Sequence, residues 1–158
     1  PRVFEHGIKA ITVEEIRWRR CDIKGINRLA NVMIAQQAHD VGAEEAIIID
    51  NGCVVEGATS NVFVVIHGKI LTAPLSHAML PGITREIIIQ EALALGGCEE
   101  RLIAFEELQH AEEIWISSSS REIAAVVELD GRPVGSAHPG ELYKKMLSLF
   151  QKRRALMS

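Results

Sequence analysis

The stretch that decides the fold runs from Ala46 to Thr72 and reads AIIIDNGCVVEGATSNVFVVIHGKILT. Its first part contains two β-rich runs, 46–50 and 53–55, separated by Asn51-Gly52. Asn-Gly tolerates the positive backbone angles that a two-residue hairpin turn requires. Because a tight turn joins strands that run in opposite directions, this stretch predicts antiparallel neighbours instead of a purely parallel sheet.

A second hairpin is predicted where His67-Gly68 separates the runs 62–66 and 70–72. The alternation of β-branched and polar residues elsewhere predicts further strands with one buried face. These strands are 7–16, 113–116 and 124–129, the last followed by a turn at Asp130-Gly131.

Helical periodicity is strongest from Ile26 to Val41, where apolar residues recur three or four positions apart and a glycine follows as a stop signal. A second helix is predicted at 83–95, entered through Pro81-Gly82 and closed by two glycines. Two more helices are predicted at 106–111 and 139–155. Since helices and strands are interspersed, we expect a mixed α/β domain.

Composition favours one globular domain that binds small molecules. The chain has 158 residues, of which 47% are hydrophobic and 24% are charged. This length and hydrophobic fraction are enough to build one buried core. The formal net charge of −4 and the scattered basic residues argue against nucleic-acid binding. No apolar run approaches the roughly 20 residues that a membrane span needs, so no membrane partner is expected.

Cys21, Cys53 and Cys98 are odd in number and far apart, which predicts neither a zinc site nor a disulfide framework. They are expected to be reduced thiols of a cytoplasmic protein. The six histidines show no metal-ligand spacing either, so no metal is expected. The chain starts at Pro1 and enters a strand-like segment within a few residues, which favours an additional N-terminal domain that is absent here.

Lys24 is a candidate nucleophile because it stands between a predicted strand and the strongest predicted helix. A lysine attacks a carbonyl as the neutral amine, and burial or nearby cations such as Arg17 or Arg19 would lower its pKa toward that form. A solvated loop lysine is the alternative for any single lysine.

Glu56 ends an apolar run and precedes the small, polar residues 57–61. A buried carboxylate at that position would need a cationic or proton-donating partner. The small neighbours would allow a ligand to approach closely. A strand-end glutamate that faces water is the alternative.

Two segments have the features of an anion site. Leu80–Arg85 (LPGITR) places free backbone N–H groups and the hydroxyl of Thr84 at a helix N-terminus, where the helix dipole favours phosphate. The hydroxyl cluster Ser117–Ser120 follows a predicted strand and could converge on a second side of the same anion. An ordinary Pro-Gly turn and a plain polar loop are the alternatives.

In this order, the segments resemble the class IV aminotransferases over nearly the whole chain. The most specific matches are Ile16–Lys24 (IRWRRCDIK), Glu44–Phe63 and Leu80–Arg85. The first of them is most similar to the D-amino acid aminotransferase subgroup. The resemblance implies the larger, C-terminal domain of that fold over residues 1–158, with a mixed, largely antiparallel sheet or barrel-like core packed with helices.

The resemblance also implies a cofactor, pyridoxal 5′-phosphate. Lys24 would form the Schiff base and later carry the proton between the substrate Cα and the cofactor. Glu56 would pair with the pyridine nitrogen. The other implied contacts are Leu80 beside the ring and, around the phosphate, Ile83, Thr84, Ser119 and Ser118.

The implied reaction moves an amino group between an amino acid, D-alanine or another D-isomer, and a 2-oxo acid such as 2-oxoglutarate, in a homodimer of the full-length protein. Pro81 and Ala58 depart from the D-specific pattern. Aminodeoxychorismate lyase and an L-specific branched-chain aminotransferase are therefore alternatives. A noncatalytic module that binds the cofactor or a partner protein is another. The isolated chain is not expected to be a competent enzyme, because the resemblance assigns an N-terminal domain part of the site.

Overall fold

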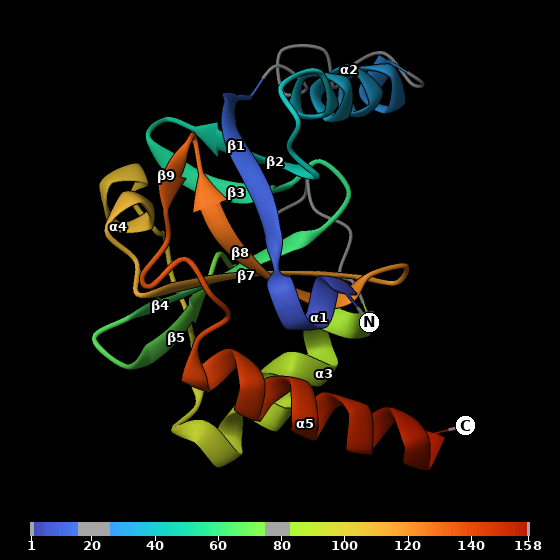
Figure 1. Cartoon of the computed structure of the whole chain (residues 1–158), viewed down its shortest axis with the longest axis vertical. Coiled ribbons are helices and arrows are strands. Elements are labelled where there is room, and N and C mark those ends of the chain that lie inside the picture. Colours follow the sequence, from blue (N-terminus) through green and yellow to red (C-terminus); the bar gives the residue numbers. More distant parts are fainter. Residues whose placement is uncertain (1, 16–25, 75–82, 158) are drawn as a thin grey trace.

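The structure is a computed structural model that describes residues 2–15, 26–74 and 83–157 (Figure 1). The helices are α1 (Arg2–His6), α2 (Ile26–Asp40), α3 (Ile83–Glu91), the 3₁₀ helix η2 (Ala92–Leu95), α4 (Phe105–Gln109) and α5 (Glu141–Met157). The strands are β1 (Ile8–Glu14), β2 (Glu45–Asp50), β3 (Cys53–Gly57), β4 (Asn61–Ile66), β5 (Lys69–Thr72), β6 (Cys98–Glu100), β7 (Glu113–Ser118), β8 (Glu122–Leu129) and β9 (Arg132–Pro133).

All the described strands belong to one sheet, in the order β3-β2-β1-β8-β7-β4-β5-β6, with β9 paired to β8. The pairs β2/β3, β4/β5, β4/β7, β7/β8 and β8/β9 are antiparallel. The pairs β1/β2, β1/β8 and β5/β6 are parallel. The prediction of a mixed, largely antiparallel sheet is confirmed.

The β3 edge of the sheet is tied both to the start of β4 and to a residue far along the chain. Gly57 N donates to Ser60 O at 2.8 Å, which brings the end of β3 next to the start of β4. At the other end of β3, Val54 N donates to Ile103 O at 2.8 Å. These contacts close the sheet partly into the barrel-like core that the sequence predicted.

The strands bury both faces of the sheet. Along β4, Val62 and Val64 belong to an inner cluster of buried residues. Phe63 and Val65 belong to an outer cluster, formed with α3 and α5. The inner cluster also contains Ile47, Ile103 and Ile114, and the outer cluster also contains Ile88, Trp115 and Tyr143. This alternation follows from the two-residue repeat of a strand. Figure 1 shows α3 and α5 together on one side of the sheet, with α2 well away from them.

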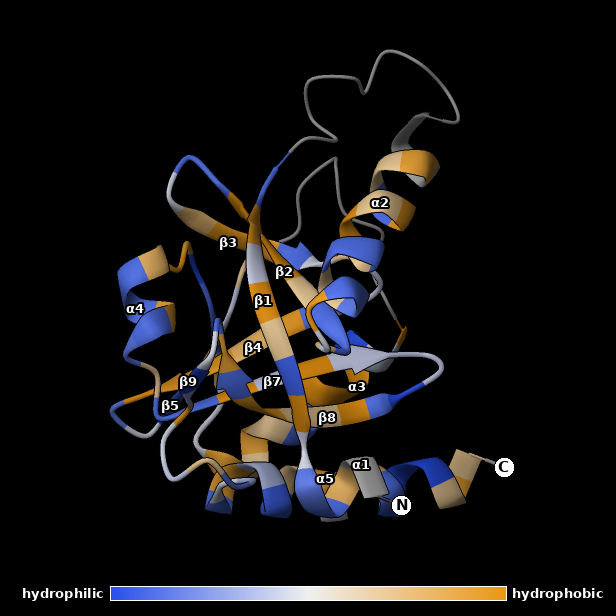
Figure 2. Ribbon diagram, turned by 45° about the horizontal axis from the view of Figure 1, so that its top comes forward, coloured by the Kyte–Doolittle hydropathy of each residue, from blue (hydrophilic) through white to orange (hydrophobic). Residues whose placement is uncertain are grey.

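The helix α5 covers the outer cluster through Tyr143, Met146 and Phe150, all of them buried. Their spacing of three and four residues places them on one helical face. Figure 2 shows hydrophobic and hydrophilic residues alternating along α5, as expected for a helix with one buried face. The Tyr143 hydroxyl donates to Ile123 O at 3.1 Å, which satisfies its buried polar end. Within the described residues, no helix is long and apolar enough to cross a membrane.

The predicted hairpins are confirmed, and their turns have the backbone angles that the sequence indicated. Asn51 and Gly52 have φ of 51° and 75°, and His67 and Gly68 have φ of 50° and 74°. The helix predicted at 83–95 is present but changes from α to 3₁₀ geometry after Glu91. Two elements, α1 and β6, were not predicted; each is short and has no clear periodicity.

Candidate functional site

Four strand ends meet at one end of the sheet. Asn61 at the start of β4 pairs with Ser117 near the end of β7. Ser118, the last residue of β7, pairs with Glu122 at the start of β8. Since the turn from β3 to β4 lies beside Asn61, Glu56 and the serine cluster are brought to the same end of the sheet.

The first turn of α3 lies at this end as well. Thr72, the last residue of β5, pairs with Phe63 near the start of β4 and donates its hydroxyl to Val62 O at 2.7 Å. Ile83 and Thr84 begin α3, and the next residue, Arg85, donates through Nη2 to Ala73 O, directly after β5, at 3.0 Å. The first N–H groups of a helix lack intrahelical acceptors and carry the positive end of its dipole. This end of the sheet therefore offers donors to an anion.

A buried carboxylate organises the turn that follows Glu56. Glu45 is only 2% exposed, and its Oε2 accepts hydrogen bonds from Ser60 Oγ at 2.8 Å and from Thr59 Oγ1 at 3.0 Å. Its Oε1 accepts from Ala46 N at 2.8 Å. These bonds compensate the cost of burying the charge. They also fix the position of the turn relative to β2.

The same turn leaves no room for a side chain at Gly57. A Cβ there would lie 2.1 Å from Ser60 Oγ and 3.0 Å from Glu45 Oε2. The glycine is thus required by close approach and not by an unusual backbone angle.

The helix that follows Lys24 is tied to this turn. Asn31 Nδ2, on α2, donates to Ala58 O at 2.9 Å. Ala58 is buried in a small cluster with Ile34 and Ala38 of the same helix. Because α2 begins at Ile26, the contact links the segment after Lys24 to the segment after Glu56.

The sequence comparisons identify the family to which this fold belongs. The family profile described as amino-transferase class IV matches residues 5–129. The chain belongs to the class IV aminotransferases. The family resemblance predicted from the three sequence segments is confirmed.

Individual class IV aminotransferases are similar over nearly all of this chain. The D-alanine aminotransferase of Bacillus licheniformis is 41% identical over 148 residues, 93% of this chain and 52% of the relative. That of Staphylococcus haemolyticus is 41% identical over 151 residues, 94% of this chain and 53% of the relative. The chain thus spans about half the length of these curated relatives.

Solved structures of the family have the same fold. A branched-chain amino acid aminotransferase from Escherichia coli has a TM-score of 0.82 at 33% identity. The match covers 90% of this chain and 51% of the E. coli chain. The branched-chain aminotransferase of Thermoproteus uzoniensis has a TM-score of 0.83 at 32% identity. The match covers 93% of this chain and 51% of that chain.

The predicted site residues of this class IV chain fall into two groups. Glu56 is half-buried on β3, Thr84 is half-buried and Ile83 is 77% exposed on the first turn of α3. Ser118 is half-buried and Ser119 is exposed at the β7 end. These five residues lie on segments that the fold brings to one end of the sheet. Lys24 and Leu80 lie outside the described residues.

The serine cluster and the adjacent Arg121 contain polar atoms that have no partner among the described residues. Ser118 Oγ accepts a hydrogen bond from Arg121 N at 3.0 Å. In contrast, the buried Ser117 Oγ and the buried Arg121 Nη1 find no hydrogen-bond partner in the described part of the chain. Buried polar atoms are normally paired, so each unpaired one needs an explanation. Unpaired donors at this end are compatible with an anionic group such as a phosphate.

Two residues of this region were not singled out from the sequence: Glu45 and Asn31. A charged residue directly before the apolar run 46–49 was the one available signal for Glu45. Asn31 lies within the predicted helix and has no motif of its own.

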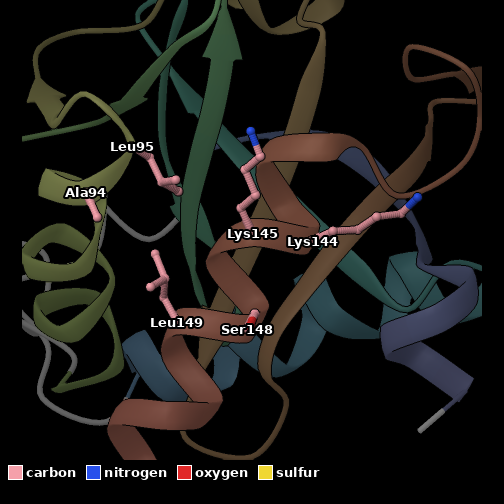
Figure 3. Close-up of a pocket in the computed structure, with 6 residues that line it drawn as sticks. All are labelled: Ala94, Leu95, Lys144, Lys145, Ser148 and Leu149. Carbon is pink, nitrogen blue, oxygen red and sulfur yellow. The ribbon is translucent and has the colours of Figure 1, made fainter.

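A hollow elsewhere on the surface contains none of the predicted site residues. It lies between η2 and α5 and is lined by Ala94, Leu95, Lys144, Lys145, Ser148 and Leu149 (Figure 3).

Within the described residues, no cluster of His, Cys, Asp or Glu could hold a metal ion. The prediction that the protein has no metal centre concerns the whole chain and remains a prediction.

Proposed function

We propose that residues 1–158 are the C-terminal, cofactor-binding domain of a pyridoxal 5′-phosphate-dependent aminotransferase. The observation that carries the proposal is the convergence of the Glu56 strand end, the serine cluster and the first turn of α3 at one end of the sheet. A solved class IV relative with a TM-score of 0.85 at 26% identity contains pyridoxamine 5′-phosphate. That relative supports the choice of cofactor.

The proposed reaction transfers an amino group between a D-amino acid, foremost D-alanine, and a 2-oxo acid such as 2-oxoglutarate. Identities of 41% to two D-alanine aminotransferases support this substrate class. The full-length protein is proposed to act as a homodimer in the cytoplasm, and the isolated chain is proposed to be inactive. The inactivity of the isolated chain is proposed because the chain matches only about half of the length of each D-alanine aminotransferase.

Lys24 is the proposed anchor and proton carrier. The bound cofactor supplies an electron sink for the pair that remains when the substrate Cα loses its proton. The Lys24 amine would hold the cofactor until a substrate amine replaced it, and the freed lysine would then accept the proton from the substrate Cα. The hydrogen bond from Asn31 to Ala58 O ties α2, the helix that follows Lys24 in the chain, to the turn that follows Glu56.

Glu56 is proposed to accept a hydrogen bond from the protonated pyridine nitrogen. A carboxylate stabilises the positive charge there and so keeps the proton on the ring nitrogen. Its strand end is fixed through Glu45, Thr59 and Ser60, which would limit reorganisation during the reaction.

The phosphate is proposed to lie at the first turn of α3, where backbone N–H groups of Ile83 and Thr84 and the Thr84 hydroxyl can donate. Ser119 and Ser118 would donate from the β7 end, and Leu80 would pack beside the ring. Each of these groups binds and orients and none exchanges a proton with the substrate.

The experiment uses the full-length protein with D-alanine and 2-oxoglutarate, and detects pyruvate and D-glutamate. Borohydride reduction followed by peptide mass spectrometry should find a pyridoxyl group on Lys24. Absence of the adduct from every lysine would overturn the cofactor assignment. Transfer of the amino group from L-leucine but not from D-alanine would instead favour a branched-chain aminotransferase. The structural similarity to the E. coli branched-chain enzyme supports this alternative.

Pyruvate release from aminodeoxychorismate without an amino acceptor would identify a lyase. Retention of the cofactor with no turnover of any of these substrates would identify a noncatalytic module. Size-exclusion chromatography with light scattering tests the homodimer.

A further inference from the structure

The first turn of α3 contains an arginine that is almost completely buried. Arg85 is 1% exposed, and its Nη2 donates to Ala73 O at 3.0 Å and to Glu100 Oε1 at 2.7 Å. Its Nη1 lies 3.4 Å from Glu86 Oε1. The guanidinium therefore connects three elements: α3, the chain just after β5, and β6.

Burial of this cation is not explained by stability alone. Removing a guanidinium from water costs more than one good ion pair commonly returns, and an apolar side chain of similar size is often as stable. The Arg85 Nε finds no partner within the described residues, and the Glu100 side chain is 45% exposed. Burial raises the pKa of the neighbouring Cys98 thiol to about 12, with Arg85 lowering it and Glu100 raising it, so the surroundings are poorly solvated.

The two contacts of Arg85 Nη2 indicate the structural role of this side chain. Thr72 and Glu100 are paired in the parallel ladder of β5 and β6, so Ala73 and Glu100 lie at the same strand ends. An arginine in the third position of α3 that binds both of them fixes the helix start against those ends. A planar guanidinium can hold two acceptors in a fixed geometry, which a lysine cannot do.

We propose that Arg85 is a positioning residue for the phosphate site: its contacts with Ala73 and Glu100 hold the first turn of α3 where Ile83 and Thr84 face an anion shared with the serine cluster. The inference rests on the proposed function. Arg85 acts through the helix: the bonds from its Nη2 to Ala73 O and Glu100 Oε1 hold the first turn of α3 against the ends of β5 and β6.

A matched control exists at the other end of the same helix. Arg153 of α5 donates to Glu91 Oε1 at 2.8 Å and to Gln90 Oε1 at 2.8 Å. It anchors the end of α3 away from the proposed phosphate. Arg153→Met therefore removes an arginine contact to α3 without releasing its first turn.

The test compares affinity for pyridoxal 5′-phosphate with affinity for pyridoxal, which lacks the phosphate. Full-length wild type, Arg85→Met, Arg85→Lys and Arg153→Met are freed of cofactor and titrated with both compounds. The shift of the melting temperature by inorganic phosphate is measured in parallel. Arg85→Met is expected to lose at least about tenfold in affinity for pyridoxal 5′-phosphate, the size of one charged hydrogen bond. Its affinity for pyridoxal should change little.

Arg85→Lys should recover only part of the preference for pyridoxal 5′-phosphate over pyridoxal. Arg153→Met should retain the full preference. If Arg85→Met does not fold, Glu100→Gln replaces it, because that change weakens the ion pair and leaves the arginine in place. A folded Arg85→Met or Glu100→Gln protein with the wild-type preference would overturn the positioning role. A wild type that neither prefers the phosphorylated compound nor responds to phosphate would instead overturn the proposed function.

Discussion

Glu45 Oε2 accepts a hydrogen bond from Ser60 Oγ at 2.8 Å, so the first residue of β2 fixes the turn between β3 and β4. The carboxylate is nearly inaccessible to solvent, and the turn follows directly on Glu56. The position of a proposed catalytic carboxylate thus depends on a second carboxylate eleven residues earlier in the chain.

Glu45→Gln should destabilise the fold by about 1–3 kcal/mol, the usual cost of leaving buried hydrogen-bonding groups unsatisfied. The amide keeps the size of the side chain, but its NH₂ group cannot accept from the hydroxyls of Thr59 and Ser60. Chemical denaturation measures the change. Glu44→Gln is the matched control, because Glu44 is exposed and its side chain accepts a bond only from Lys9 N among the described residues. Equal losses in both variants would contradict the role of Glu45.

Gly57→Ala should destabilise the protein by about 1–3 kcal/mol, because a new methyl group in a closely packed site forces its neighbours to move. The nearest neighbour is Ser60 Oγ, 2.1 Å from the position that the methyl carbon would occupy. Removal of that oxygen in Gly57→Ala/Ser60→Ala should recover part of the loss. A double-mutant cycle measured by thermal denaturation gives the coupling. Strictly additive effects would show that the two positions do not interact.

Asn31→Ala should cost about 1 kcal/mol, since it removes one hydrogen bond to a buried carbonyl. The Ala58 turn should then open more often. Hydrogen exchange with mass spectrometry on a peptide covering residues 57–60 would detect faster exchange. Gln36→Ala is the control on the same helix, because the Gln36 side chain is exposed and bonds only Asp40 in the described part of the chain. Unchanged exchange in Asn31→Ala would refute the coupling of α2 to the turn.

Glu107 should give the protein an acid-dependent stability. The Arg101 guanidinium, followed by the backbone N–H of Ala104, lowers the pKa of Glu107 from 4.5 to about 2. Because the folded pKa is the lower one, the carboxylate stabilises the fold above pH 4.5, and this contribution is lost as the pH falls toward 2. The two side chains are 36% and 34% exposed, so solvent screening limits this contribution to under about 1 kcal/mol.

Free energies of unfolding between pH 2 and 6 would show this loss in wild type and its absence in Glu107→Gln. Glu106→Gln, on the exposed side of the same short helix, should retain the wild-type slope. A wild-type slope in Glu107→Gln would mean that other carboxylates cause the pH dependence.

Glu56→Gln should slow the proton-abstraction step by at least about tenfold, a modest share of what positioned acid–base groups contribute. A neutral amide no longer stabilises the proton on the pyridine nitrogen. Single-turnover kinetics with Cα-deuterated D-alanine would isolate that step, and cofactor content would be measured to separate binding from chemistry. An unchanged rate at full cofactor occupancy would exclude Glu56 from this role.

Local turn chemistry could be predicted because it acts over a few residues. Asn51-Gly52 and His67-Gly68 adopt positive φ angles in the structure and reverse the chain as expected. The helix at 26–41 was predicted from its repeat and ends at Asp40. The roles of Glu56, Ile83 and Ser119 were assigned from the family resemblance, and they remain proposals.

The sequence by itself therefore determined the family, the hairpins and the main helices of this protein, because motifs and hydrophobic periodicity are properties of short segments. Only the tertiary structure decided that β1 lies between β2 and β8 with both pairings parallel. It alone placed Glu45 at the β3–β4 turn and Arg85 against Ala73 and Glu100. These contacts join residues far apart in the chain, and they form where burial forces each polar group to find a partner.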